Sequence, residues 1–399
     1  MGTFAQRMSG VSVSATLKVA AEAERLRRAG HSVVDFSAGE PDFPTPEHVK
    51  SAAKTAIDAN FTRYTAAAGV PELREAICTR YKAQYGVDIT AAEVLMTVGG
   101  KQALFNTALA LVDPGDEVVT HAPYWPTIPE QVKLVGGVPV IVSTSSDDGF
   151  AVTADAIIAA MTPKTKAIIL NSPANPTGGL IEESAVAAIA DEAARRGVWV
   201  IVDLCYEQLI YETVPHNLPK VLFDRHRDKT VLAGSASKSY AMTGWRCGWT
   251  IAPKDLTSVF NIIQGQTTSN IASITQKAAL AAVSGPQTAV QEMLDEYRTR
   301  RDNIHTWLTA HPAIKCVKPK GAFYLFPDIS GLLAPGTTST DFAQGLLEKE
   351  HVVVTPGEAF DAPGYLRISY ATSMEQLREG ATRILRYAES LQPAKAGTR

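Results

Sequence analysis

Through the middle of the chain, short apolar runs alternate with longer stretches whose apolar residues recur every three to four positions. The short runs are rich in β-branched residues and are typical of buried strands, whereas the longer stretches are typical of helices that cover a sheet. This alternation predicts an α/β domain with a mainly parallel seven-stranded sheet flanked by helices. Strands are predicted over residues 93–98, 117–120, 138–142, 166–170, 198–202, 230–233 and 249–252, and helices over 101–111, 125–135, 153–160 and 182–196.

Helical patterns flank this region on both sides. Thr45 is a favoured N-cap residue and is followed by a proline, which predicts a helix that begins here and ends at Asp58, and Pro71 begins a second helix. Beyond the last predicted strand of the sheet the pattern stays helical to about Trp307. The C-terminal part then predicts a second, smaller α+β domain. Its expected elements are strands over 322–326 and 366–370, a closing helix over 374–391 and a tail over 392–399.

Length and composition indicate an ordinary globular protein. The chain has 399 residues, which exceeds the usual size of one hydrophobic core and favours two domains. Hydrophobic residues make up 45% of the chain and charged residues 20%. The net charge is -3 and there is no long run of like charges, so we expect neither a nucleic acid nor a membrane as partner.

The four cysteines have no C-x-x-C spacing, so neither a disulfide framework nor a thiolate metal site is expected. The histidines show no metal-ligand spacing either. The N-terminus lacks the apolar block of a signal peptide, and no apolar run is long enough to cross a bilayer. Together with scattered cysteines, which suit a reducing compartment, this predicts a cytoplasmic protein without a metal.

The segment Ser235-Ala236-Ser237-Lys238, followed by Arg246, carries the strongest candidate chemistry. Lys238 and Arg246 fall between two predicted buried strands. A lysine in such a place loses solvation, which lowers its pKa and lets its neutral amine attack a carbonyl. An arginine beside it offers a planar fork for a phosphate, and a lysine with a phosphate clamp is what pyridoxal phosphate requires. Taken singly, both side chains are more often ordinary surface residues.

Polar groups also follow other predicted strands, at the sheet edge where ligands bind. Gly99 and Gly100 open a helix whose free N–H groups suit a phosphate, although glycine turns are common. Asn175 lies in a turn made rigid by two prolines, where its side chain is available to a ring oxygen; Asn-Pro is also a frequent turn former.

Four further side chains have two interpretations each. Asp203 ends a predicted strand and suits a protonated pyridine nitrogen, or else caps a helix. Tyr206 suits a hydrogen bond to a phenolic oxygen, or else packs in the core. Trp125 suits stacking on a flat ring, or ordinary packing. Arg367 suits a substrate carboxylate, or else a surface ion pair.

The ordered set of motifs resembles the class I aminotransferases, which are pyridoxal phosphate enzymes of fold type I, and is closest to the bacterial aspartate aminotransferase subgroup. The resemblance runs roughly from residue 14 to residue 386. No single motif decides it, but the set in this order is highly specific. The matching segments are Ala38-Gly39-Glu40-Pro41-Asp42-Phe43, Gly99-Gly100-Lys101-Gln102-Ala103, Asp113-Pro114-Gly115-Asp116-Glu117-Val118, Asn175-Pro176-Thr177-Gly178, Ser235-Ala236-Ser237-Lys238 and Ala241-Met242-Thr243-Gly244-Trp245-Arg246.

The resemblance implies a cofactor site for pyridoxal 5'-phosphate. Lys238 would form the covalent bond to the cofactor, with Asp203 on the pyridine nitrogen and Tyr206 on the ring oxygen as the other catalytic groups. The remaining implied cofactor contacts are Gly99, Gly100, Ser235 and Arg246 around the phosphate, Tyr64 reaching the phosphate from the partner subunit, Asn175 on the ring oxygen, Trp125 stacked on the ring, and Lys101 next to the phosphate glycines.

The resemblance also implies substrate contacts and an assembly. Arg367 and Asn175 would hold the α-carboxylate, Gly39 and Trp125 would line the pocket, and Lys101 would bind the distal carboxylate of an acidic substrate. The implied reaction is ping-pong transamination between aspartate and a 2-oxo acid such as 2-oxoglutarate, in a homodimer with shared active sites. The implied domains are residues 1–45 as an N-terminal segment of the small domain, 46–286 as the large cofactor-binding domain and 287–399 as the C-terminal small domain.

The chain departs from the family in three places. Leu204 and Cys205 stand inside a motif that is usually Asp-Glu-x-Tyr, which alters the surroundings of the two functional residues. Subgroup members that accept prephenate carry a lysine where this chain has Ser12, so prephenate activity is not expected. The segment 264–271 lacks the arginine that another subgroup uses for dicarboxylates. Donor choice therefore depends on Lys101, with aromatic, branched or other amino acids as alternatives.

Other enzyme classes were weighed against this hypothesis. A fold type I lyase or decarboxylase would use the same cofactor site. An acyl hydrolase with Ser235 and Lys238 lacks the partner motifs Ser-Asp-Asn and Lys-Thr-Gly. A nicotinamide dehydrogenase and an ATPase are disfavoured because G-x-G-x-x-G and Walker A spacings are absent. A regulatory module would need a DNA-binding segment, for which no part of the chain is left.

Overall fold

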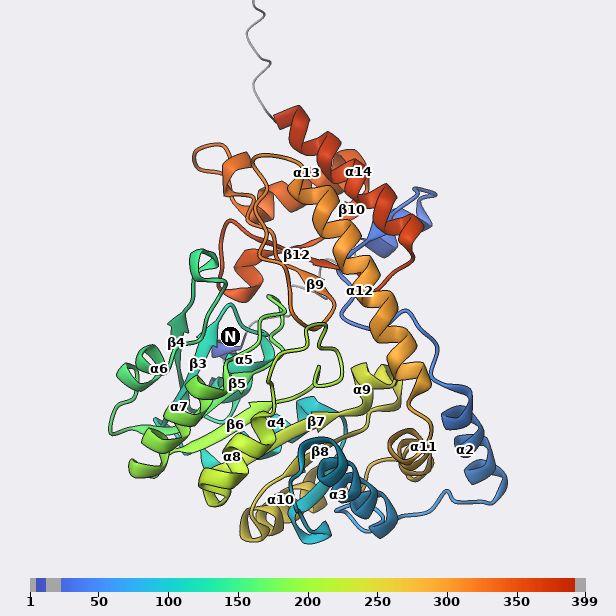
Figure 1. Ribbon diagram of the computed structural model, residues 1–399, viewed down its shortest axis with the longest axis vertical. Helices are drawn as coiled ribbons and strands as arrows, with labels where there is room; N and C mark the ends of the chain where they lie inside the picture. The colour runs from blue at the N-terminus through green and yellow to red at the C-terminus, as the bar shows by residue number, and fades with distance from the viewer. Residues whose placement is uncertain (1–4, 12–22, 392–399) are drawn as a thin grey trace, which may run out of the picture.

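The computed structural model describes residues 5–11 and 23–391, so the predicted tail over 392–399 lies outside the described residues. The larger part is built on one seven-stranded sheet, and a smaller part, which contains the C-terminal helices, lies at one end of it (Figure 1). A strand was predicted at each of the seven positions in the large sheet, and the ends lie within about two residues of prediction.

The large sheet is mainly parallel, as predicted. Its strand order is β2-β8-β7-β6-β5-β3-β4, and only β8 runs antiparallel to its neighbours β2 and β7. The six other strands run in one direction, so their carboxyl ends meet at one edge. The strands are β2 (Val94–Thr97), β3 (Glu117–Ala122), β4 (Val138–Ser143), β5 (Thr165–Asn171), β6 (Trp199–Asp203), β7 (Thr230–Ser235) and β8 (Gly248–Ile251).

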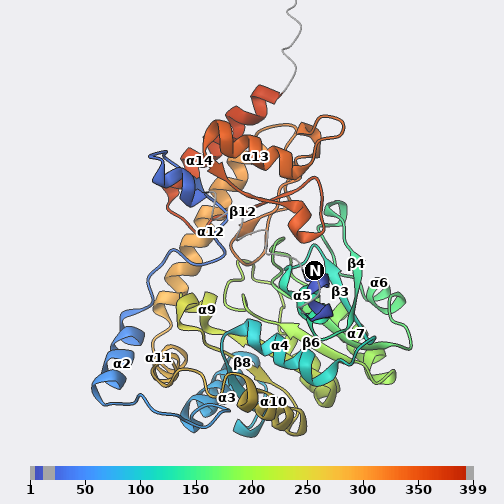
Figure 2. The same cartoon turned by 180° about the vertical axis from the view of Figure 1, so that it is seen from behind.

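Both faces of this sheet are buried, because successive strand residues point to opposite sides. In β6, Val200 and Val202 pack in one core while Ile201 packs in the other. Helices α3, α7, α8 and α11 contribute to the first core, and α4, α5 and α10 contribute to the second, as the two opposite views show (Figures 1 and 2). The helices are α3 (Pro71–Tyr85), α4 (Gly100–Leu111), α5 (Thr127–Leu134), α7 (Glu183–Arg195), α8 (Leu218–His226), α10 (Lys254–Thr267) and α11 (Ser273–Ser284).

Helix α2 (Glu47–Asp58) packs against α11, and its start differs from the prediction. Pro46 occupies the N-cap position, so the expectation that Thr45 caps the helix is wrong. The Thr45 hydroxyl instead donates to the carbonyl oxygen of Ala241 at 2.6 Å and accepts from the Trp245 indole at 2.9 Å. A tertiary contact therefore replaces the local cap.

The smaller part combines a segment around residue 35 with the C-terminal region of the chain. Strand β1 (Val34–Asp35) pairs in parallel with β10 (Val352–Val353), and Phe36 shares a core with Ile368. A second sheet has the order β11-β12-β9, all antiparallel. The domain boundaries at residues 45 and 286 stay a prediction. The other elements are β9 (Tyr324–Leu325), β11 (Thr355–Pro356), β12 (Leu366–Ser369), α12 (Thr288–Thr309), α13 (Ser339–Glu350) and α14 (Met374–Leu391).

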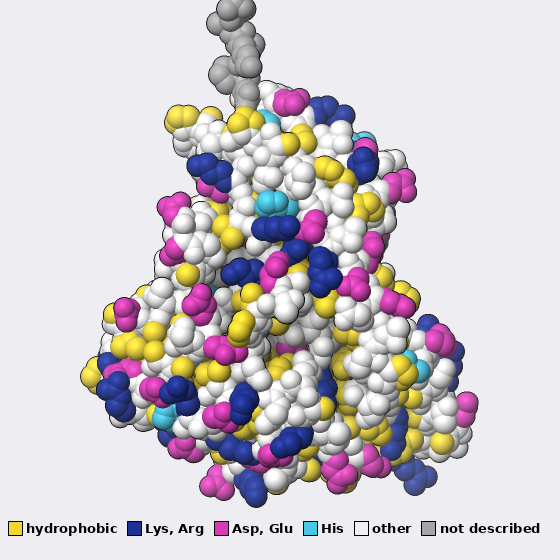
Figure 3. Space-filling view, in the orientation of Figure 1, with side chains coloured by type: hydrophobic (Ala, Val, Ile, Leu, Met, Phe, Trp, Pro, Cys, Tyr) yellow, Lys and Arg dark blue, Asp and Glu magenta, His cyan; other side chains and the backbone are white. Residues whose placement is uncertain are grey.

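Short elements complete the fold. Helices α6 (Ala154–Ala159) and α9 (Ala236–Ser239) lie beside the large sheet. Among the described residues, no helix has the length and apolar character needed to cross a membrane. On the face shown in Figure 3, basic and acidic side chains are interspersed. The 3₁₀ helices are Gln6–Gly10, Ala91–Glu93, Ser146–Asp148, Arg227–Lys229, Thr243–Trp245, Ser330–Leu332 and Gly357–Phe360.

The docking of α14 on β1 predicts a stability effect at Gly380. A Cβ atom there would lie 2.2 Å from Phe36 Cζ, and Phe36 is fully buried. We expect Gly380→Ala to lower the free energy of unfolding by about 1–3 kcal/mol, because the core must shift to make room. The control is Gly265→Ala in α10, where no heavy atom lies within 4 Å and alanine is the better helix former. Urea denaturation of both variants checks this; equal midpoints would contradict the close packing.

Candidate active site

Several predicted site residues stand at the carboxyl edge of the large sheet. Asp203 is the last residue of β6 and Ser235 is the last residue of the neighbouring β7. Lys238 follows within α9, immediately beyond this edge. In an open α/β sheet, ligands bind at this edge. The structure thus brings the lysine, the serine and the aspartate together.

The amine of Lys238 is half-buried and donates a hydrogen bond to the carbonyl oxygen of Gly39. Burial lowers the pKa of this amine, and the nearby Arg367 and Arg246 guanidinium groups lower it further, against an opposite influence from Cys205. A lysine with a lowered pKa presents more of its neutral, nucleophilic form. The predicted loss of solvation at Lys238 is therefore present.

Asp203 is a buried carboxylate, 3% exposed. Burial raises its pKa to about 6, although the backbone N–H of Cys205 donates to its Oδ1 at 3.0 Å and the charge of Lys238 opposes the rise. Within residues 5–11 and 23–391 it forms no ion pair. The alternative that Asp203 caps a helix is wrong, because the residues after it form a turn.

A narrow cradle forms between the glycines before α4 and the arginine after α9. Gly99 has φ 78°, in the region that favours glycine, and a Cβ atom on it would lie 2.5 Å from Arg246 Nη2. A Cβ on Gly100 would lie 3.4 Å from the Cβ of Ser235. Arg246 donates to the carbonyl oxygens of Thr243 at 2.7 Å and Val98 at 3.4 Å, and it forms no ion pair with any described residue. The start of α4 and a guanidinium without an ionic partner among the described residues thus lie around the same small space.

The Ser235 hydroxyl is committed to the backbone. It accepts from the N–H of Ser237 at 3.1 Å and donates to the carbonyl oxygen of Cys247 at 3.4 Å. Lys238 donates to Gly39 instead of to this hydroxyl. A serine nucleophile needs a base within hydrogen-bonding reach, so the geometry speaks against the acyl hydrolase alternative.

Arg367 is a buried cation, 3% exposed, with open bonding capacity. It donates to Asn175 Oδ1 at 3.2 Å and to the carbonyl oxygen of Ser37 at 2.9 Å, while its Nε has no partner. Its guanidinium carbon lies 4.5 Å from the Tyr324 ring centroid and 5.1 Å from that of Phe360. No carboxylate of the described chain pairs with it, so the surface ion pair considered from the sequence is wrong. The arrangement suits an anionic ligand.

Lys101 and Trp125 lie together at the outer side of the site. The Lys101 amine is 5.1 Å from the centroid of the Trp125 ring, within the range of a cation–π contact. Burial lowers the pKa of Lys101, and the charge of Arg246 lowers it further. Trp125 is half-buried and packs against the core on one face of the sheet, so stacking on a ring stays a prediction.

Sequence analysis missed Tyr324, which is fully buried between several predicted residues. Its hydroxyl oxygen lies 2.8 Å from that of Tyr206. A Cβ on Gly39 would lie 3.3 Å from the same hydroxyl. The pattern over 322–326 predicted a strand but gave no reason to prefer this aromatic over Phe323 beside it. Only the pairing of β9 with β12 brings it next to Arg367.

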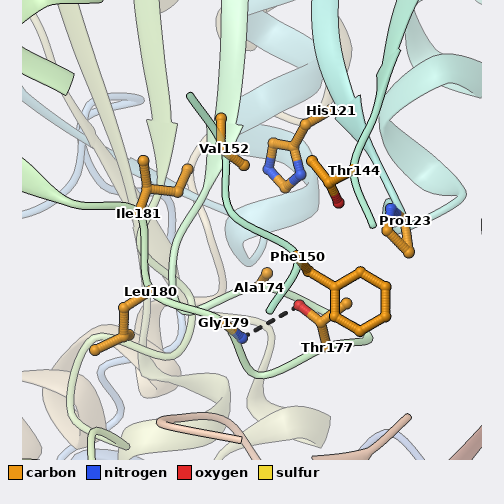
Figure 4. A pocket seen from close by; sticks show the side chains of 10 residues that line it. All are labelled: His121, Pro123, Thr144, Phe150, Val152, Ala174, Thr177, Gly179, Leu180 and Ile181. Carbon is orange, nitrogen blue, oxygen red and sulfur yellow. Dashed lines mark hydrogen bonds between the residues drawn. The ribbon is translucent and has the colours of Figure 1, made fainter. Parts of the chain in front are cut away.

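Sequence analysis also missed Asn171, the last residue of β5. Its Oδ1 accepts from the backbone N–H of Asn175 at 2.8 Å, and its Nδ2 donates to the carbonyl oxygen of Asp203 at 3.3 Å. His121 Nε2 accepts from the Asn171 N–H at 3.3 Å, and burial lowers the pKa of His121 to about 4. His121 also lines a small pocket against the same turn, with Thr177 nearby (Figure 4). These neutral side chains fix the turn that carries Asn175.

A buried ion pair supports the segment after Asp203. Arg80 Nη2 lies 2.5 Å from Glu207 Oε1, and both side chains are almost fully buried. Tyr85 and Tyr81 donate to the second oxygen of Glu207 at 2.7 Å and 3.3 Å. The pair joins α3 to the turn that contains Tyr206, because Glu207 is the next residue.

One predicted site residue is not part of this assembly. Tyr64 is 89% exposed, and this chain alone does not bring it to the cradle. Of the positions where the chain departs from the family, Ser12 lies outside the described residues. Leu204 is buried in a hydrophobic core, 2% exposed. No group of three or more His, Cys, Asp or Glu side chains suited to a metal occurs in the part of the chain that is described.

The raised pKa of Asp203 predicts a pH-dependent stability. Between about pH 4 and pH 6, Asp203 holds a proton in the folded state that it has lost in the unfolded state. The free energy of unfolding therefore falls as pH rises through this window, and the loss stays constant above pH 6. We expect Asp203→Asn to stabilise the protein, dialysed free of small molecules, by about 3 kcal/mol near pH 8 and to have little effect near pH 4. Thermal unfolding at several pH values checks this, with exposed Asp58→Asn as control. A variant less stable than wild type at high pH would contradict it.

Comparison with known proteins agrees with this geometry. The family model for aminotransferase class I and II matches residues 31–384. The aspartate aminotransferase of Streptomyces avermitilis is 43% identical over 95% of this chain and 94% of its own length. The aspartate/prephenate aminotransferase of Cereibacter sphaeroides is 41% identical over 98% of this chain and all of its own length.

The fold is shared with solved structures as well. The aspartate aminotransferase from Thermus thermophilus with maleate superposes with a TM-score of 0.92, at 40% identity, over 97% of this chain and all of that one. The recognised resemblance and the predicted fold type I architecture are thereby confirmed. The chain belongs to the class I and II aminotransferases and is a transaminase.

Proposed function

We propose that the chain is a pyridoxal phosphate-dependent aminotransferase that moves amino groups between aspartate, or another acidic amino acid, and a 2-oxo acid such as 2-oxoglutarate. One observation carries the proposal. Two buried charges of opposite sign, Asp203 and Arg367, have no ionic partner in the described chain, and Lys238 with its lowered pKa lies near both. Such a set suits a cofactor cation, a substrate anion and a nucleophilic amine.

The residues present fit the cofactor. The cradle of Gly99, Gly100, Ser235 and Arg246 combines the N-terminus of α4 with a guanidinium that has no ionic partner among the described residues, which suits a phosphate, and a side chain on Gly99 would collide with Arg246. Lys238 would hold the aldehyde carbon. When bound, pyridoxal phosphate supplies a carbonyl that condenses with amines and a ring that accepts the electron pair released at the substrate Cα.

Asp203 and Tyr206 would tune the ring from two sides. An ionised Asp203 favours a proton on the pyridine nitrogen, and the buried position strengthens this attraction. The Tyr206 hydroxyl and Asn175 would bind the phenolic oxygen. Trp125 would cover one ring face, and Cys205, beside Asp203, carries a thiol whose pKa burial raises to about 12, so it stays neutral.

Lys238 would also move the proton. Once its amine is free, the lowered pKa favours its neutral form, so Nζ would take the proton from the substrate Cα and return it later in the reaction. A ping-pong order follows, because the first 2-oxo acid leaves before the second enters. A lyase or decarboxylase would use the same groups, but the relatives compared are aminotransferases.

The substrate assignment rests on two basic side chains. Arg367, with Asn175 at 3.2 Å, would hold the α-carboxylate, and Gly39 would line the same space. Lys101 would reach the distal carboxylate of an acidic substrate. The names of the relatives support aspartate, and the Thermus thermophilus structure carries maleate, which is a dicarboxylate. Aromatic or branched donors remain the alternative, and prephenate is not expected.

The assembly and location complete the proposal. The high exposure of Tyr64 supports a homodimer in which this side chain reaches the phosphate of the partner subunit. A cytoplasmic location stays a prediction from the cysteine pattern and the N-terminus. The partners are small amino acids and 2-oxo acids.

The central test is Lys238→Ala. Because this variant lacks both the amine that holds the cofactor and the group that moves the proton, we expect turnover to fall by about 10⁴-fold or more. Borohydride reduction followed by mass spectrometry should find cofactor on the peptide containing position 238 in wild type and none in the variant. Lys54→Ala on exposed α2 is the control. Activity close to wild type in Lys238→Ala would contradict the proposal.

Substrate choice is tested at Lys101. We expect Lys101→Gln to raise the KM for aspartate by about 10- to 100-fold, the value of one hydrogen bond to a charged group, and to change the KM for alanine by less than about threefold. A donor panel followed by the colour change of the bound cofactor provides the measurement, and product analysis separates 2-oxo acids from elimination products. An equal effect on both donors would mean that Lys101 does not bind the distal carboxylate.

A further inference from the structure

Tyr324 lies where residues from three segments of the site meet. Its hydroxyl oxygen is 2.8 Å from that of Tyr206 and would be 3.3 Å from a Cβ on Gly39. Its ring centroid is 4.5 Å from the guanidinium carbon of Arg367. It is fully buried, so none of these contacts is shared with solvent. Tyr324 therefore contacts both Tyr206, which is proposed to bind the cofactor oxygen, and Arg367, which is proposed to bind the substrate carboxylate.

These contacts cross from the smaller part of the protein to the larger. Tyr324 begins β9, where it pairs with Ser369 of β12, the strand of Arg367. Tyr206 comes from the turn after β6, at the edge of the large sheet. The carbonyl oxygen of Gly39 accepts from Lys238, so Tyr324 also touches the segment that holds the lysine.

The proton count of the two hydroxyls sets the direction of their hydrogen bond. Burial raises the pKa of both Tyr206 and Tyr324, so each keeps its single proton near neutral pH. The other titratable or charged groups that face the pair are Arg367 from β12 and Cys205 from the turn after β6. If Tyr206 donates its proton to a ligand oxygen, the bond between the hydroxyls must be donated by Tyr324.

We propose that Tyr324 is a positioning residue for transamination, which acts on the cofactor oxygen through the Tyr206 hydroxyl and holds the substrate arginine Arg367 against its ring. This inference rests on the proposed function, because it requires a ligand oxygen opposite Tyr206. Two hydrogen bonds in series polarise each other, so the donation by Tyr324 strengthens the donation by Tyr206. A stronger donor stabilises negative charge on that oxygen. The face of the Tyr324 ring attracts the guanidinium of Arg367 and restricts the orientation of its N–H donors.

The hydroxyl role is tested with Tyr324→Phe, which removes one oxygen atom and keeps the ring. We expect the pH midpoint of the visible absorbance change of the bound cofactor to rise by about half to one pH unit, because negative charge on the ring oxygen loses support. The matched control is Tyr370→Phe. Tyr370 is equally buried and donates to the carbonyl oxygen of Ala322 at 3.3 Å, away from the cofactor groups. Its midpoint should equal that of wild type.

The ring role is tested with Tyr324→Leu. This variant also lacks the hydroxyl, so the pH midpoint of its cofactor absorbance should shift by the same amount as in Tyr324→Phe. It therefore replaces Tyr324→Phe as the test of the hydroxyl if that variant does not fold. In addition, its KM for every amino donor should rise by about 3- to 30-fold, because the α-carboxylate is common to all of them and Arg367 has lost the nearer of its two aromatic faces. Tyr324→Phe keeps that face, and its KM should stay within about twofold of wild type.

The outcomes separate the inference from the proposed function. If wild type and Tyr370→Phe bind pyridoxal phosphate without any pH-dependent absorbance change, the proposed cofactor chemistry fails. If these two proteins titrate normally and the midpoints of Tyr324→Phe and Tyr324→Leu coincide with theirs, Tyr324 has no influence through Tyr206. A shift that persists when Tyr206→Phe is the background would also overturn the inference, because the effect would not pass through Tyr206.

Discussion

The site depends on two buried charges that have no ionic partner among the described residues. Transfer of a charge out of water costs several kcal/mol when no opposite charge receives it. Asp203 is held by one backbone N–H at the end of β6, and Arg367 is held by two oxygen acceptors and two aromatic faces. Both charges therefore remain available to a ligand that brings a cation to one and an anion to the other, and binding such a ligand removes the electrostatic cost.

A buried ion pair supports the part of the chain that carries one of these charges. Arg80 and Glu207 form this pair, two tyrosines donate to Glu207, and the pair anchors the turn that follows Asp203. If one member of such a pair were removed, the other would be left as an uncompensated buried charge, which would lower the free energy of unfolding by several kcal/mol. The intact pair therefore supports the turn. Asn171 supports the turn that carries Asn175 by accepting a hydrogen bond from its backbone N–H. Its neighbour His121 is neutral near pH 7 because burial lowers its pKa, so it adds no charge to the region.

Much of this was predictable from sequence where the cause is local. Strand ends follow from alternation and from turn residues, so Asp203 was placed correctly at the carboxyl edge of the sheet. Gly99 before α4 has a backbone conformation that favours glycine, which is visible in the sequence. Tyr324 and Asn171 were missed because their roles depend on contacts with residues far along the chain, such as Tyr206, 118 positions away. Thr45 was misjudged for the same reason, since a distant carbonyl takes its hydroxyl.

The segment from Ser37 to Gly39 joins the two parts of the site. Arg367 donates to the carbonyl oxygen of Ser37, and Lys238 donates to that of Gly39, two residues further on. A carboxylate bound to Arg367 would compete with the carbonyl oxygen of Ser37 for the guanidinium donors. A covalent bond made by Lys238 would likewise compete with the carbonyl oxygen of Gly39 for the amine. Tyr324 packs against Gly39, and its hydroxyl is hydrogen-bonded to that of Tyr206. The segment from Ser37 to Gly39 and one buried tyrosine thus link the proposed carboxylate site at Arg367 to the surroundings of Lys238 and Tyr206.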